Sequence, residues 1–111
     1  MENNDKERVL NLLSDEARDY GSDADWYDSQ HAQGLSELCR YAQKTICDFI
    51  EVAREECKDA DAIDELLDQV RYDYFNRYKS LQSEHFDHLA ELAMSGYMAL
   101  GDIATLIELN K

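Results

Sequence analysis

The feature that most restricts the fold is a long stretch of helical spacing between residues 34 and 58. Apolar side chains recur there every three or four positions and so share one helix face: Leu35, Leu38, Cys39, Ala42, Ile46, Phe49, Ile50, Ala53 and Cys57. The chain contains no proline and four glycines, so few residues would interrupt helices. The alternation of period two that a half-buried strand requires is missing. The sequence therefore predicts an all-α protein.

Two further helices are expected on either side of this long one. The first covers residues 5–20 and ends at Gly21, because glycine readily adopts the left-handed conformation that terminates helices. The other begins after Asp59 or Asp61, either of which can cap it, and ends near Gln82. Ser83 would then cap the following helix.

A last helical region is expected at residues 84–110. Gly96 and Gly101 weaken it, and Asp102 could cap a separate short helix. We therefore expect a single-domain bundle of four helices over residues 1–111, with a fifth short helix as a variant.

The charge is strongly acidic and unevenly distributed. The chain holds 25 acidic and 11 basic residues, which gives a net charge of −14 at pH 7. Residues 1–31 hold nine acids and three bases, whereas residues 32–58 hold five and four. Nucleic acids and anionic membranes carry the same sign, so we expect direct binding to neither. The expected partner is a basic protein surface, unless the acidity serves solubility alone.

The acidic excess forms two clusters. Carboxylates three or four residues apart on a helix lie about 5–6 Å from each other, a spacing comparable to that of DNA phosphates. The candidate partner-binding residues are Asp15, Glu16, Asp19, Asp23, Asp25, Trp26, Tyr27 and Asp28 in the first cluster, and Asp59, Asp61, Asp64, Glu65 and Asp68 in the second. Helix capping and the helix dipole alone would explain four of them: Asp23, Asp25, Asp59 and Asp61. Only the acidic residues beyond these four argue for a basic partner.

Aromatic residues stand beside these carboxylates. Trp26, Tyr27 and a tyrosine-rich third helix supply more rings than a small core needs, and exposed aromatics are typical interface anchors. Residues 71–79 mix basic and aromatic side chains as nucleic-acid stacking platforms do. Their rings have core spacing and Asp73 lies among them, so a core stripe is the preferred interpretation.

No catalytic site is predicted, because the sequence contains no nucleophile elbow, P-loop or dinucleotide fingerprint. The acidic run at residues 59–64 resembles the start of a calcium loop, but Asp64 stands where that loop needs glycine. On a helix, His85, His88 and Glu91 would share one face and could hold a divalent metal. A solvated helix face is the simpler interpretation. We expect a non-enzymatic protein without a cofactor or metal.

The cysteines and the apolar segments indicate a cytoplasmic protein. Cys39, Cys47 and Cys57 form no C-x-x-C pair and are typical of reduced core residues. The N-terminal residues have neither the basic nor the apolar region of a secretory signal. The most apolar stretch, residues 89–109, carries three acidic side chains, which argues against a simple membrane span.

In size, charge and helicity the chain is similar to the small acidic DNA-mimic inhibitors of phages and plasmids. Those proteins block restriction enzymes, CRISPR effectors and other DNA-binding proteins. The charge also resembles that of helical immunity proteins that cap nuclease toxins. The resemblance implies an anti-restriction or anti-CRISPR inhibitor that occludes a basic nucleic-acid-binding site. The alternative is an adaptor bundle, dimeric through an apolar patch around Tyr97, Met98, Ile103 and Ile107.

Overall fold

The expected all-α fold is confirmed. The computed structural model describes the backbone of residues 2–110 and the side chains of residues 5–110. Within that range there are four helices and no strand: α1 (Glu2–Ser29), α2 (Gln33–Glu56), α3 (Ala60–Ser83) and α4 (Asp87–Leu109). The long apolar stripe predicted at residues 34–58 is α2.

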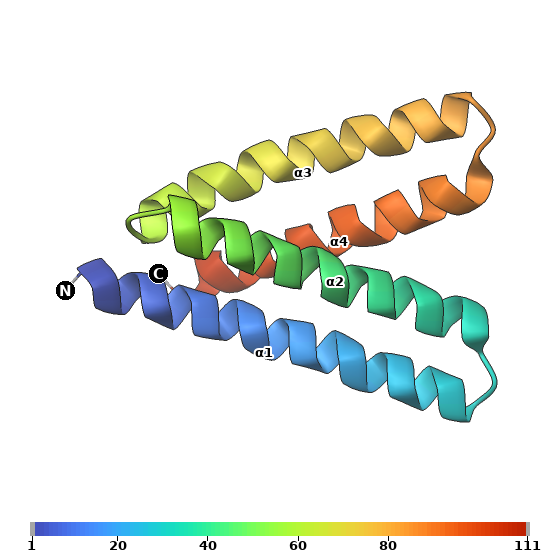
Figure 1. Ribbon diagram of the computed structural model, residues 1–111, viewed down its shortest axis with the longest axis horizontal. Helices are drawn as coiled ribbons and strands as arrows, with labels where there is room; N and C mark the ends of the chain where they lie inside the picture. The colour runs from blue at the N-terminus through green and yellow to red at the C-terminus, as the bar shows by residue number, and fades with distance from the viewer. Residues whose placement is uncertain (1, 111) are drawn as a thin grey trace.

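The helices form two antiparallel hairpins, α1–α2 and α3–α4, that pack through α2 and α4 (Figure 1). The hairpins converge at the end where the chain begins and finishes, and they diverge toward the α1–α2 and α3–α4 turns (Figure 1). The largest fully buried side chains come from all four helices at or near the convergent end: Leu10, Leu13, Ile46, Ile63, Leu67, Leu100 and Ile103. The core therefore fills one part of the molecule and leaves the outer helices α1 and α3 apart at the other.

Both hairpin turns use the same backbone device. His31 and His85 adopt a left-handed conformation, with φ of 60° and 66°. The residue after each histidine donates a hydrogen bond back to the last helical turn, Ala32 to Tyr27 and Phe86 to Leu81, at 2.9 Å each. This is a helix-terminating motif in which glycine is the usual left-handed residue. Histidine fills that position in both hairpins.

The predicted end of the first helix at Gly21 is wrong. α1 continues to Ser29, so Asp23 and Asp25 lie inside a helix, and capping does not explain their charge. Gly21 instead faces α2, where an added Cβ would lie 2.4 Å from Nε2 of Gln43. The space that a side chain would fill at Gly21 is thus occupied by the amide group of Gln43 from α2. Capping does explain Asp59, whose Oδ1 accepts the N–H of Ala62 at 2.8 Å.

The last helical region also differs from the expectation. α4 is continuous through Gly96, Gly101 and Asp102, so no separate short helix forms within residues 87–109. Gly96 packs so tightly that an added Cβ would lie 2.6 Å from the ring of Tyr74. Ser83 does not cap α4, because it is the last residue of α3 and donates to the carbonyl of Ser80.

α4 carries more apolar surface than the core covers. By length and composition it could cross a membrane, with a mean hydropathy of 1.3 over its most apolar segment, a test that core helices also pass. A third of that segment is buried in the bundle. Leu89 and Met98 are exposed, whereas Leu100 and Ile103 are fully buried. The helix therefore presents apolar side chains on its outer side as well as its inner side.

Candidate binding surface

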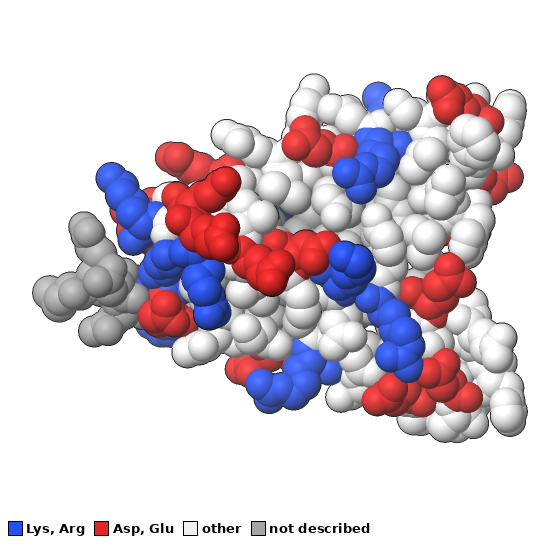
Figure 2. All heavy atoms as spheres, in the orientation of Figure 1, with Lys and Arg blue, Asp and Glu red and all other residues white. Residues whose placement is uncertain are grey.

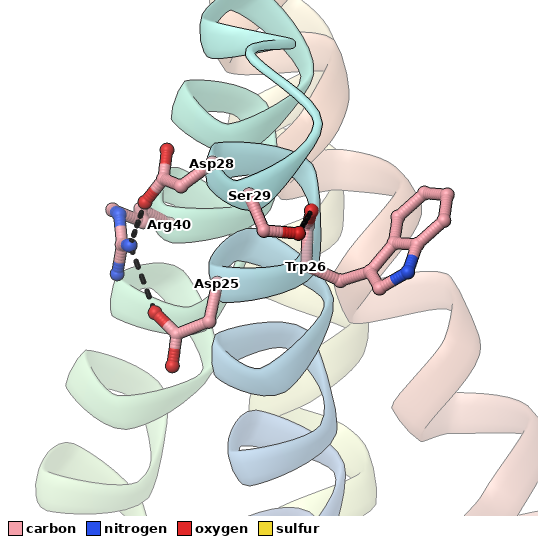
Figure 3. Close-up of polar contacts among 5 residues, drawn as sticks. All are labelled: Asp25, Trp26, Asp28, Ser29 and Arg40. Carbon is pink, nitrogen blue, oxygen red and sulfur yellow. Dashed lines mark hydrogen bonds and ion pairs between the residues drawn. The ribbon is translucent and has the colours of Figure 1, made fainter.

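Three of the predicted carboxylates in the first cluster are paired with arginines. Arg40 of α2 donates to both Asp25 and Asp28, at 3.0 Å in the case of Asp25 (Figure 3). Hydrogen bonds from Ser36 and from Arg40 lower the pKa of Asp28. Asp15 pairs with Arg18 at 3.0 Å. Each arginine offsets one negative charge, so these three carboxylates and two arginines together retain a single negative charge and attract a basic partner less than three unpaired carboxylates would.

The other carboxylates of the cluster are uncompensated. Glu16, Asp19 and Asp23 have no basic partner among the side chains of residues 5–110. Their spacing of three and four residues places them on one side of α1. Partial burial raises the pKa of Glu16, and the charges of Asp19, of Asp102 on α4 and of Asp23 raise it further. We call Glu16, Asp19, Asp23 and Asp102 the acidic stripe.

Tyr20 links the part of the acidic stripe on α1 to Asp102 on α4. Its hydroxyl group donates to Oδ2 of Asp102, so α1 and α4 are joined at this point. Burial, followed by this hydrogen bond and the charge of Asp102, raises the pKa of Tyr20 far above its usual range. On the face shown in Figure 2, which α2 crosses, Lys and Arg side chains lie among the Asp and Glu side chains. No basic side chain described in the structure pairs with the acidic stripe.

The two predicted aromatic residues differ in exposure. Trp26 is 59% exposed, and its indole points away from the Arg40 ion pairs (Figure 3). Tyr27 is half-buried and contacts the Trp26 ring edge-on, with a centroid distance of 5.3 Å. Trp26 is therefore displayed beyond the acidic stripe, near the end of α1.

The second predicted cluster lies elsewhere, at the start of α3. Asp61 and Asp64 line a cavity of about 330 Å³ that also contains Arg8. Glu65 and Asp68 are exposed on α3. α1 and α3 occupy opposite edges of the molecule, and the cluster lies toward the convergent end (Figure 1). The structure therefore does not bring the two clusters into one surface.

A groove that the sequence interpretation missed runs along α4. Its volume is about 410 Å³, and all four helices line it: Tyr20 of α1, Leu38 of α2, Tyr78 of α3, and Glu91, Met94, Ser95 and Met98 of α4. Met98 is 61% exposed. We call this groove the α4 groove. Two methionines four residues apart, opposite the core side of a helix, were the signal in the sequence.

The apolar patch proposed for a homodimer does not exist as predicted. Ile103 and Ile107 are buried in the core. Tyr97 is half-buried, with its ring 5.4 Å from that of Phe75 and under the guanidinium of Arg71. Of the four residues, Met98 alone is exposed.

The alternative of a metal-binding row at His85, His88 and Glu91 is not supported. His85 lies in the turn before α4, so it shares no helix face with His88 and Glu91. Nε2 of His88 instead lies 2.8 Å from Oε1 of Glu37 on α2. Among the described side chains, no group of three or more His, Cys, Asp and Glu could hold a metal.

The basic and aromatic side chains of residues 71–79 contact one another. Arg77 lies over the ring of Tyr74 at 4.7 Å, and Lys79 lies over that of Phe75 at 5.5 Å. Phe75 and Tyr72 are nonetheless exposed, at 38% and 67%. The preferred core interpretation therefore holds only in part, since some of these rings face solvent.

The cysteines differ in accessibility. Cys57 is buried, Cys39 is half-buried and Cys47 is exposed. Burial raises the pKa of the Cys39 and Cys57 thiols. The prediction of core residues is therefore right for Cys57 and wrong for Cys47.

Comparison with known proteins finds no matching family model, no matching curated protein and no matching solved structure.

Proposed function

We propose that this protein is a non-enzymatic, acidic binding protein whose acidic stripe occupies a basic nucleic-acid-binding site on a partner protein. The observation that carries the proposal is the absence of basic partners around Glu16, Asp19 and Asp23 among the described residues, although Arg18 and Arg40 pair with their neighbours. A carboxylate row that repels itself gains most from an external cation. The partner classes in view are restriction enzymes, CRISPR effectors and nucleases.

The helical scaffold supports this role. α1 is unbroken over 28 residues and spans roughly 42 Å, so the row is held on a rigid element. Rigid presentation lowers the entropy lost on binding. Carboxylates about 5–6 Å apart can replace phosphates in a groove built for nucleic acid without any base readout.

Trp26 supports a protein partner in particular. An exposed tryptophan at the end of the same helix offers a large apolar contact, and tryptophan is enriched among residues that dominate interface energies. The charge would speed the encounter, and the ring would slow dissociation.

The test is capture of partners from a host lysate across a salt series, with wild type compared with Glu16→Lys, Asp19→Lys and Asp23→Lys combined. We expect wild type to enrich nucleic-acid-binding proteins, with capture falling steeply as salt rises. The triple variant should lose this capture. The matched control is Glu65→Lys, Asp68→Lys and Asp73→Lys combined, which makes the same charge change at exposed positions of α3.

The outcomes separate the alternatives. Loss of capture in the control and not in the stripe variant would move the contact to the second cluster. Salt-insensitive capture of proteins without basic surfaces would contradict the proposal and favour the adaptor bundle.

A further inference from the structure

We propose that the α4 groove binds one amphipathic, basic α-helix of the partner protein. This inference rests on the proposed function and names the segment that the partner presents. The groove continues from the acidic stripe, because Tyr20, which lines the groove, is bonded to Asp102 of the stripe.

The groove offers apolar contact and little unsatisfied polarity. Ser95, which lines the groove, already donates to the carbonyl of Leu38 at 2.8 Å. The hydroxyl group of Tyr20 is engaged with Asp102. Because these two polar groups already have partners, a small polar ligand would find few hydrogen bonds beyond those of Tyr78 and Glu91 at the edges, whereas apolar side chains would displace water from the rest of the groove at no such cost.

The methionines suit a helix as the occupant. Met94 and Met98 are four residues apart and so lie along one line of α4. Their unbranched side chains adjust to the shape of an incoming ridge of Leu or Ile, as flexible methionines do in grooves that bind amphipathic helices.

The groove is long enough for two helical turns. Its lining residues on α4 run from Glu91 to Met98. Their separation of seven residues corresponds to about 10 Å along α4. A helix of that length has room for an apolar face of two or three side chains, and the residues that flank this face would reach Asp102, which Tyr20 links to the groove.

The charges at the rim select a basic helix over other occupants. Glu91 lines the groove, Asp102 accepts a hydrogen bond from Tyr20 of the lining, and Glu16 lies within electrostatic reach of Asp102. No described basic residue pairs with these three carboxylates. Lys or Arg flanking an apolar helix face would meet these charges. A second copy of this chain, which carries a net charge of −14, would bring like charge to the same rim, as would an anionic membrane.

The test uses a fluorescent synthetic peptide of about four turns, with leucine on one helical face and lysine on the other. Fluorescence anisotropy measures its affinity for the full chain, and circular dichroism measures the helix that it gains on binding. A scrambled peptide of the same composition has the same charge without the apolar face. We expect the amphipathic peptide to bind at least about tenfold more tightly than the scrambled one.

The variants locate the site. Met94→Gln combined with Met98→Gln should weaken the binding of the amphipathic peptide at least about tenfold. Val52→Gln, a similar change at an exposed position of α2 outside the groove, should change affinity by less than about twofold. Thermal melting of both variants confirms that each is folded at the assay temperature.

Three results would overturn the proposal. Equal binding of both peptides would show that charge alone acts. Methionine variants with unchanged peptide affinity would place the helix elsewhere. Self-association that is lost in the methionine variants would assign the groove to a second copy of the chain. Binding to zwitterionic vesicles that is lost in the same variants would assign it to a membrane.

The two proposals fail in different ways. If the stripe variant loses lysate capture while the methionine variants leave peptide binding unchanged, the acidic function stands and the groove inference falls. If the peptide binds through the methionines while the lysate yields no basic partner, the groove stands and the proposed function falls.

Discussion

Tyr20 of α1 donates a hydrogen bond to the carboxylate of Asp102 on α4, and this contact joins the two hairpins where the α4 groove meets the acidic stripe. Tyr20→Phe keeps the ring in the groove lining and removes the bond. We expect the free energy of unfolding to fall by about 0.5–1.5 kcal/mol, measured by urea denaturation. Tyr72→Phe is the control, because Tyr72 is 67% exposed and should change stability little. An equal loss in both variants would contradict the assignment.

Glu16 should make stability depend on pH. Its folded-state pKa lies above the ordinary value of 4.5, so the folded state binds this proton more tightly than the unfolded chain. The stability contributed by the protonated group is present below pH 4.5 and is lost as pH rises through the folded pKa.

Glu16→Gln should therefore raise the free energy of unfolding at neutral pH by about 0.2–0.5 kcal/mol, the usual size of a like-charge pair on a solvated helix. The difference between wild type and variant should vanish well below pH 4.5, as measured by thermal melting across pH. Glu51→Gln removes the same charge from α2 and provides the control. A neutral-pH loss of stability in Glu16→Gln would show that the carboxylate has a partner.

Much of the fold follows from local sequence. The apolar spacing of residues 34–58 matches α2 at Gln33–Glu56, and Asp59 caps α3 as its position indicates. The positions of the turns are harder to predict from the sequence. The left-handed residues are His31 and His85, whereas Gly21, the expected helix terminator, lies inside α1. The contact between Gly21 and the Gln43 side chain of α2 depends on how the two helices pack, which spacing along the chain does not reveal.

The candidate site depended on tertiary structure to a larger degree. Glu16, Asp19 and Asp23 were among the predicted residues, but the pairing of Asp25 and Asp28 with Arg40 depends on how α1 and α2 align. The sequence suggests only a capping role for Asp102, because its proximity to Glu16 arises when α4 packs beside α1. The α4 groove is lined by residues of all four helices, so the spacing of Met94 and Met98 was its one local signal and could not by itself predict a groove.

The left-handed histidines give a test of the turns. His85→Gly should raise the free energy of unfolding by about 0.5–1 kcal/mol, because the strain of a side chain at positive φ exceeds the extra entropy of unfolded glycine. His88→Gly, three residues later in the first turn of α4, should lower stability, because glycine is a poor helix former and the contact with Glu37 is lost. Chemical denaturation of the two variants should thus give shifts of opposite sign. A loss of stability in His85→Gly would contradict the backbone geometry.

Gly96 should resist enlargement. Gly96→Ala places a Cβ 2.6 Å from the Tyr74 ring and 3.0 Å from Oγ1 of Thr45, so α4 must move away from its neighbours. We expect a loss of about 1–3 kcal/mol, although alanine favours helix formation. Gly34→Ala in α2 meets nothing within 4 Å and should be neutral or stabilising. Calorimetric melting of both variants makes the comparison, and a stable Gly96→Ala would refute the tight packing.

The cysteines should react at different rates. Burial raises the pKa of Cys39 and Cys57 and lowers their thiolate fraction, whereas Cys47 is exposed. A chromogenic disulfide reagent at mildly alkaline pH should modify one thiol quickly and the other two slowly. Cys47→Ser should remove the fast phase. A fast phase that persists in this variant would show that the bundle opens around Cys39 or Cys57.

The central claim is that the acidic stripe takes the place of nucleic acid, and competition tests it most directly. A partner captured from lysate is bound to the immobilised protein, and duplex DNA or single-stranded RNA is added at fixed salt. We expect the partner's own nucleic-acid ligand to release the partner, with the amount released rising with ligand concentration. A stable ternary complex of protein, partner and nucleic acid would contradict the account.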